Sequence, residues 1–272
     1  MKQRVITGAG LIVFLVTLLC LPGWFMALMT LICVGFAVWE EYHCLAMAGH
    51  RVVSWPTWVF TIFSVPLTAI FGHKVIVPLL AGTMLIITVV VLFREKPKLD
   101  DLSMSILPLM AVQLPGLSLV AMSLVEQKAV EVVLLTLTFA VPLMGDIMAL
   151  LVGSKLGGPK LCPAVSPKKT ISGAIGGLVG SLLAAVLVWL LAGAICNEAT
   201  LAKLPTVWEY LLLGVLGGIV GQVGDLFASL VKRHSGVKDF SNLFPGHGGM
   251  LDRLDSVLFM AILMYCYRLF AA

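Results

Sequence analysis

Charged residues are scarce in this sequence, and its cysteines are too scattered to define a site. Asp, Glu, Lys and Arg make up 12% of the 272 residues, whereas hydrophobic residues make up 60%. None of the six cysteines forms a CxxC pair, so neither a zinc site nor a disulfide framework is indicated. The net charge of +4 is modest and no basic patch is interleaved with aromatic residues, so we expect no nucleic-acid partner.

Long apolar runs dominate what is present. The mean hydropathy is +1.07, and runs of about 20 apolar residues are long enough to cross a bilayer as helices. We therefore predict an all-α integral membrane protein, a polytopic bundle of about nine transmembrane helices with cytoplasmic active-site loops. The predicted spans are 5–21, 24–42, 55–72, 75–93, 105–125, 129–153, 173–194, 207–231 and 253–271. Prolines interrupt the third and fifth of them, at Pro66, Pro108 and Pro115.

The spans predict two regions. An N-terminal transmembrane region, 1–128, holds about five helices, and its first span, after MKQR, is interpreted as a retained signal anchor. A C-terminal catalytic region, 129–272, holds about four helices and the loops 154–172 and 232–252. Glycines at small-xxx-small spacing in spans seven and eight predict close helix packing; they are Gly173, Gly177, Gly214, Gly218 and Gly221. Glu40, Glu41 and the charges from Arg94 to Lys98 are interpreted as interfacial, with no role assigned.

The distribution of basic residues predicts the orientation. With a cytoplasmic N-terminus and nine alternating spans, 14 of the 18 Lys and Arg residues lie on the cytoplasmic side and 4 outside. This is a positive-inside pattern. Most of the difference comes from the two polar loops of the C-terminal region, since the other basic residues divide almost evenly.

The stretch 229–255 is unusually polar for so hydrophobic a chain. Asp225, Ser229 and Lys232 lie at i, i+4 and i+7, on one face of a predicted helix. An ionised Asp inside an apolar span costs about 2.5–3.5 kcal/mol. Asp225 is therefore interpreted as a metal ligand or a lysine partner facing a cytoplasmic cleft. The alternative is a packing residue bonded to Gln222 or Ser229.

Two further carboxylates and a glycine-rich turn follow. Asp252 and Asp255 would share the first helical turn of the last span, either as helix N-terminal charges or as oxygen ligands for a divalent ion. Gly248 and Gly249 could let backbone N–H groups approach a phosphate. His247 has two possible roles, to donate a hydrogen bond to a phosphate oxygen or to cap the turn. In the second polar block, 146–177, Lys168 and Lys169 lie at headgroup depth and predict either an anionic substrate or plain membrane anchoring.

The polar stretch resembles the signature of the phosphatidate cytidylyltransferase (CDP-diacylglycerol synthase) family. The matching residues are Ser229, Lys232, Arg233, Lys238, Asp239, Ser241, Phe244, Pro245, His247, Gly248, Gly249, Asp252, Arg253 and Asp255. The second block resembles the same family at Asp146, Ala149, Gly153, Gly157, Ser166, Pro167, Lys169 and Thr170. Leu150 and Ser172 depart from the pattern, at positions where an aromatic residue and a Glu are usual.

The resemblance implies an enzyme that transfers a cytidylyl group from CTP to phosphatidate, giving CDP-diacylglycerol and pyrophosphate, with Mg²⁺ or another divalent cation. The residues expected to be catalytic are Asp225, Lys232, Asp252 and Asp255. Those expected to bind metal are Asp225, Asp252 and Asp255. Those expected to bind substrate are Ser166, Lys168, Lys169, Thr170, Ser229, Arg233, Lys238, Asp239, His247, Gly248, Gly249 and Arg253.

Two other functions are kept as alternatives. A CTP-dependent polyprenol or lipid kinase would use similar groups, but it would transfer the γ-phosphoryl group. A membrane transporter would use Asp146 and Asp225 as ion sites, but no inverted repeat is seen. We expect CTP, phosphatidate and membrane lipids as partners, leave a homodimer open, and expect a multi-pass protein of the bacterial inner membrane with its active site facing the cytoplasm.

Overall fold

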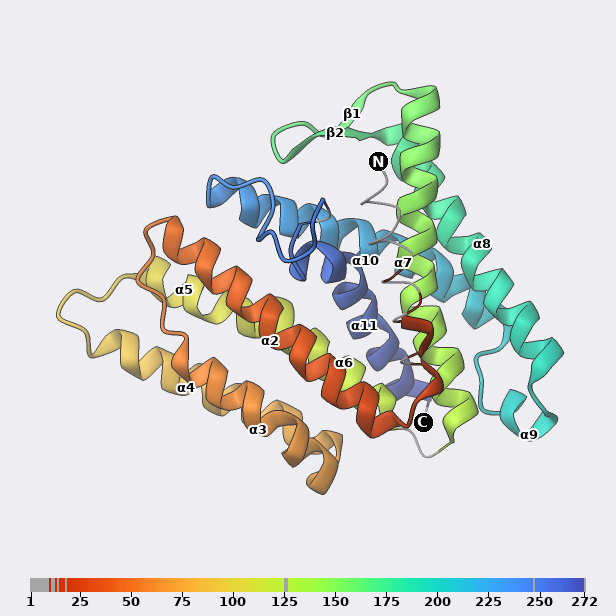
Figure 1. Ribbon diagram of the computed structural model, residues 1–272, viewed down its shortest axis with the longest axis horizontal. Coiled ribbons are helices and arrows are strands. Elements are labelled where there is room, and N and C mark those ends of the chain that lie inside the picture. The colour runs from red at the N-terminus through yellow and green to blue at the C-terminus, as the bar shows by residue number, and fades with distance from the viewer. Residues whose placement is uncertain are drawn as a thin grey trace. The chain divides into compact units, whose positions relative to one another are not determined.

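The computed structural model describes residues 10, 13, 15–17, 19–124, 127–246 and 248–271 of a largely helical chain (Figure 1). The elements are α2 (Gly23–Met47), α3 (Trp55–Phe71), η1 (His73–Val75), α4 (Ile76–Leu92), α5 (Leu99–Pro108), η2 (Leu109–Gln113), α6 (Leu114–Ser123), α7 (Lys128–Leu156), β1 (Lys160–Cys162), β2 (Ser166–Thr170), α8 (Ile171–Ile195), α9 (Glu198–Leu201), α10 (Val207–His234) and α11 (Leu251–Ala271). Each predicted span from the second to the ninth falls on a helix or a continuous helical run. The first, 5–21, lies mostly outside the described residues.

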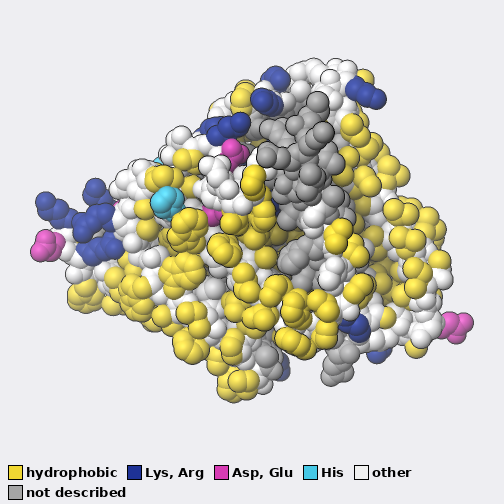
Figure 2. Space-filling model, in the orientation of Figure 1, with side chains coloured by type: hydrophobic (Ala, Val, Ile, Leu, Met, Phe, Trp, Pro, Cys, Tyr) yellow, Lys and Arg dark blue, Asp and Glu magenta, His cyan; other side chains and the backbone are white. Residues whose placement is uncertain are grey.

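Five helical segments of the described chain are long and apolar enough to cross a membrane. They are α2, the continuous run Leu99–Ser123, α7, α8 and α10. Helix α4 is apolar but shorter. The chain is therefore a multi-pass membrane protein, whereas the predicted number of nine spans is not confirmed. Hydrophobic side chains cover much of the face seen in Figure 2, and Lys and Arg side chains gather where α4 connects to α5.

The chain forms two compact units that interleave along the sequence. One comprises 1–124 and 231–253, and the other comprises 125–230 and 254–272. Helices α10 and α11 each begin in one unit and end in the other. Residues 231–253, which carry most of the polar stretch, thus belong to the same unit as the N-terminal helices.

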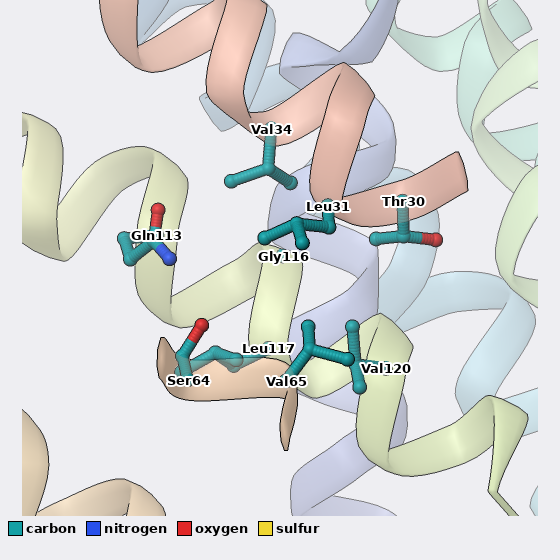
Figure 3. Close-up of a pocket in the computed structure, with 9 residues that line it drawn as sticks. All are labelled: Thr30, Leu31, Val34, Ser64, Val65, Gln113, Gly116, Leu117 and Val120. Carbon is teal, nitrogen blue, oxygen red and sulfur yellow. The ribbon is translucent and has the colours of Figure 1, made fainter. Parts of the chain in front are cut away.

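In the first unit, α2 packs against α6, and α3 packs against α4 (Figure 1). The prolines do not end their helices: α3 continues through Pro66, and a π-helical segment, η2, lies between Pro108 and Pro115. Prolines lack the N–H of a regular helix, and π-helical turns are one way in which a helix absorbs such a defect. Figure 3 shows a small, mainly apolar pocket between α2, α3 and the η2–α6 segment, lined by Thr30, Leu31, Val34, Ser64, Val65, Gln113, Gly116, Leu117 and Val120.

In the second unit, α7 and α8 form a closely packed pair joined by an antiparallel hairpin of β1 and β2 (Figure 1). Close approach requires glycine: a Cβ on Gly173 would lie 2.9 Å from the Ala149 carbonyl oxygen of α7. Similar contacts surround Gly177, Gly214, Gly218 and Gly221. The predicted close packing around these glycines is therefore confirmed. It fixes the hairpin, and the basic residues that it carries, to the ends of two rigid helices.

Candidate active site

The Asp252 carboxylate, in the first turn of α11, is the centre of a hydrogen-bonded cluster in the first unit. Its Oδ1 accepts from the Lys232 ammonium at 2.6 Å. Its Oδ2 accepts from the Phe240 N–H at 2.8 Å and the Gly249 N–H at 2.9 Å. Both side chains of the ion pair are largely buried, with 12% of Lys232 and 4% of Asp252 exposed. The pair joins the end of α10 to the start of α11 and closes the connection between them, residues 235–250, which we call the signature loop.

A second buried carboxylate holds the same loop. Glu40, on α2, accepts from the Ser241 hydroxyl at 2.6 Å, the Met250 N–H at 2.9 Å and the Leu251 N–H at 2.7 Å. Only 1% of Glu40 is exposed, as is only 1% of Glu41. The interpretation of these two residues as interfacial charges is therefore wrong. Sequence reasoning missed Glu40 because its partners are 201 to 211 residues away, although two adjacent acids in an apolar run were a usable signal.

The two signature glycines make room for these carboxylates. Gly248 has a φ of +83°, and a Cβ there would lie 2.7 Å from Asp252 Oδ2. A Cβ on Gly249 would overlap the carboxylate of Glu40. The Gly249 N–H, which was expected to face a phosphate, donates to Asp252 instead. In this structure the glycines serve the loop's internal packing, because carboxylates occupy the space where their side chains would be.

The second unit holds two further groups of polar side chains, an ion pair of Lys169 with Asp225 and a hydrogen-bonded set of Asp146, Asp255 and Ser256. The Lys169 ammonium, on β2, forms an ion pair with Asp225 Oδ2, on α10. Asp225 is thus a lysine partner, one of the two roles expected for it.

The Ser256 hydroxyl lies between Asp255 and Asp146. Its oxygen is 3.3 Å from Asp255 Oδ1 and 3.4 Å from Asp146 Oδ2, and its single O–H donates to one carboxylate at a time or is shared between them. Gly224 lets α10 approach α11 here, since a Cβ on it would lie 2.6 Å from the Asp255 carbonyl oxygen. The hairpin and α10 therefore supply one group, and α7 and α11 supply the other.

The hairpin places its polar residues through local bonds. Thr170 is buried and caps α8, since its hydroxyl accepts from the Gly173 N–H at 3.1 Å. The Ser172 hydroxyl donates to the Gly157 carbonyl. Ser172, one of the two departures from the family pattern, therefore ties the two ends of the hairpin together. Lys168 is exposed, whereas Lys169 and Ser166 are partly buried.

The remaining predicted residues lie at the surface or outside the described chain. Lys238, Asp239 and Arg253 are exposed, and the exposed Arg233 donates to the Val237 carbonyl at 3.5 Å. Ser229 is partly buried on α10. His247 lies outside the described residues, so both of its expected roles stay predictions.

Carboxylate oxygens are suitable ligands for a hard divalent cation. Of the three acids expected to bind one, Asp252 belongs to the first unit, and Asp225 and Asp255 belong to the second. In the part of the chain that the structure describes, no three His, Cys, Asp or Glu residues are placed to hold a metal together. Mg²⁺ does not require such a set, because it usually takes one or two carboxylates and completes its shell with water and phosphate oxygens. One or two of Asp225, Asp252 and Asp255 would be enough for this mode. Asp252 already accepts hydrogen bonds at both oxygens.

Comparison with known proteins agrees with these motifs. The profile of the cytidylyltransferase family matches residues 2–271, nearly the whole sequence. The chain belongs to the cytidylyltransferase family. It is similar to proteins named phosphatidate cytidylyltransferase: 43% identical over 129 residues to that of Brucella abortus (strain 9-941), and 41% identical over 121 residues to that of Bacillus subtilis (strain 168).

The Synechocystis protein of the same name is 39% identical over 136 residues. These matches cover 44 to 48% of this chain and 41 to 44% of each relative. The chain therefore spans less than half the length of these three relatives.

Proposed function

We propose that this protein transfers the cytidylyl group of CTP to phosphatidate, giving CDP-diacylglycerol and pyrophosphate. The observation that carries the proposal is the similarity of this cytidylyltransferase-family chain to several bacterial proteins named for that reaction. The ion pairs Lys232–Asp252 and Lys169–Asp225 support it, because they combine lysines with carboxylates, the groups that reactions at phosphorus require.

The lipid phosphate is the nucleophile in this mechanism. One of its oxygens forms a bond to the α-phosphorus of CTP, and the bond between that phosphorus and the oxygen bridging to the β-phosphate breaks, which releases pyrophosphate. No protein side chain needs to form a covalent intermediate, because the phosphate monoester is already an anion. The protein contributes positioning of the substrates and neutralisation of their charge. We assign these roles to Lys168 and Lys169 of the hairpin and to four cations between residues 232 and 253, which are Lys232, Arg233, Lys238 and Arg253.

We propose Mg²⁺ as the cofactor, with ligands among Asp225, Asp252 and Asp255. When bound, the ion would offset the negative charge that develops on the phosphate oxygens. Asp225 is a better candidate for a ligand than Asp252. The ion pair uses one oxygen of Asp225, whereas Asp252 would have to give up contacts with Lys232 or with the loop backbone.

Product identity tests the proposed reaction against lipid kinase activity. Purified protein in detergent is given CTP labelled in the cytosine ring, with either phosphatidate or a polyprenol as the lipid, with and without Mg²⁺. We expect labelled CDP-lipid and one pyrophosphate for each molecule of CDP-lipid, and only in the presence of the ion. Labelled free CDP together with a newly phosphorylated lipid would identify the kinase instead.

We also propose that the protein resides in the inner membrane of a bacterium and that the hairpin and the signature loop face the cytoplasm. A single cysteine placed in 156–165 or 235–243, in a chain whose six natural cysteines are replaced, should react only with reagents that enter the cytoplasm. Lys203→Cys, on the side expected to be external, is the matched control and should react with impermeant reagents in intact cells. Labelling of either loop from outside would refute this orientation.

A further inference from the structure

We propose that Glu40 is a positioning residue that holds the start of α11 and the signature loop in their working arrangement. It is buried on α2, far from the signature in sequence, and it accepts hydrogen bonds from Ser241, Met250 and Leu251. The inference rests on the proposed function only in assigning the loop a part in the reaction. The contacts themselves lie within the first unit.

The first step concerns the free end of a helix. The first N–H groups of a helix have no partner within it and are satisfied by a capping side chain, water or a ligand. Helix α11 begins at Leu251, so its cap position is Met250, whose side chain has no oxygen to accept from these N–H groups, and the two residues before it are glycines. Glu40 supplies the acceptor from another helix, and its carboxylate occupies the space that a side chain on Gly249 would fill.

The second step concerns charge. A carboxylate near a helix N-terminus is stabilised by the partial positive charge there. Asp252 reaches back to the Gly249 N–H, as an acid in the first turn does in a capping box. Glu40 and Asp252 therefore divide the backbone donors of this turn between them. Withdrawal of Glu40 would leave two N–H groups unpaired and would loosen the segment that presents Asp252 to Lys232.

The neighbouring acid provides a matched control. Glu41 is as buried as Glu40, with 1% exposed, but neither of its oxygens has a hydrogen-bond partner in the part of the chain that the structure describes. Glu40→Gln and Glu41→Gln therefore make the same acid-to-amide change at adjacent, equally buried positions of one helix. Only the first should disturb the loop.

Hydrogen exchange gives a readout that does not depend on activity. In purified Glu40→Gln protein, exchange of the peptide that contains Met250 and Leu251 should be at least about tenfold faster than in the wild type, because the hydrogen bonds to an amide are weaker than those to a carboxylate. Glu41→Gln should leave this peptide unchanged. Turnover should fall about 10- to 100-fold in Glu40→Gln, the scale of a small misplacement of catalytic groups. We expect KM for CTP to change much less than kcat.

A double-mutant cycle tests the contact with Gly249. Gly249→Ala should be severely disruptive in the wild type, whereas adding it to Glu40→Ala should cost little more, because the space is then vacant. Coupling is read from thermal unfolding in detergent and from turnover.

Unchanged exchange in Glu40→Gln would overturn the proposal, as would additive effects of Glu40→Ala and Gly249→Ala. If Glu40→Ala fails to fold, the proposal is tested with the isosteric Glu40→Gln variant alone, by hydrogen exchange of the peptide that contains Met250 and Leu251. If the wild type makes no CDP-lipid, the proposed function fails, while exchange still reports on Glu40.

Discussion

Replacing Asp252 with asparagine is expected to cut turnover at least about a hundredfold, the scale of losing a key electrostatic group, and to lower stability as well. The amide cannot accept from Lys232 and from the two backbone N–H groups together, so a cation with 12% of its side chain exposed loses its partner. Breaking a buried ion pair from one side costs about 3–5 kcal/mol. Thermal unfolding and steady-state kinetics of the purified variant measure the two effects.

Asp255→Asn is the informative companion to this variant. Asp255 Oδ1 accepts from the N–H and hydroxyl of Ser256, and the amide oxygen of Asn can keep these bonds. We expect a similar loss of turnover, measured by the same steady-state kinetics. Asp100→Asn, an exposed acid in the first turn of α5, controls for a change in surface charge. Near-normal turnover in both Asp252→Asn and Asp255→Asn would mean that these acids serve only the helix end.

Lys169→Gln is expected to weaken substrate use by roughly 1.5–3 kcal/mol, the strength of a charge-assisted hydrogen bond, or about 10- to 150-fold in kcat/KM. Lys169 forms the ion pair with Asp225, whereas Lys168 is exposed, so Lys168→Gln should have the smaller effect. Arginine should not replace Lys169, because its planar fork differs from a compact ammonium. The measurement is kcat/KM in detergent, with CTP and phosphatidate varied separately.

The pairing with Asp225 adds a further test of this prediction. Lys169→Gln and Asp225→Asn should be strongly non-additive, since each removes the other's partner. Lys203→Gln, an exposed lysine of the same unit, controls for the loss of a positive charge. If all Lys168 and Lys169 variants keep wild-type kinetics and only their yield changes, these lysines are membrane anchors.

Sequence periodicity and composition located the helices well because a bilayer span demands a long apolar run whatever its partners. The range 207–231, for example, lies within α10, Val207–His234. The prolines were the less certain points, since sequence alone does not show whether a helix ends or absorbs the defect. Between Pro108 and Pro115 the helix continues through a π-helical segment and does not end.

Side-chain pairing was harder to foresee, because it depends on contacts distant in sequence. The i, i+4, i+7 pattern placed Asp225 and Lys232 on one helix, but it did not indicate that Asp225 pairs with Lys169 and Lys232 with Asp252. The glycines before α11 predicted close backbone approach, and they are indeed closely approached, but by two carboxylates of the protein. Long-range partners of this kind leave no periodic trace in a sequence.

The contacts between Glu40 and the signature loop determine which parts of the chain must be kept together in a fragment or a chimera. A fragment from residue 129 to the end would contain every signature residue, but it would lack the acceptor for the Met250 and Leu251 N–H groups. The loop's integrity is a shared property of 231–253 and the N-terminal helices, which form one compact unit. With the role proposed for Glu40, a fragment that keeps the signature loop in place must include α2, and a chimera that exchanges α2 must carry its acid along.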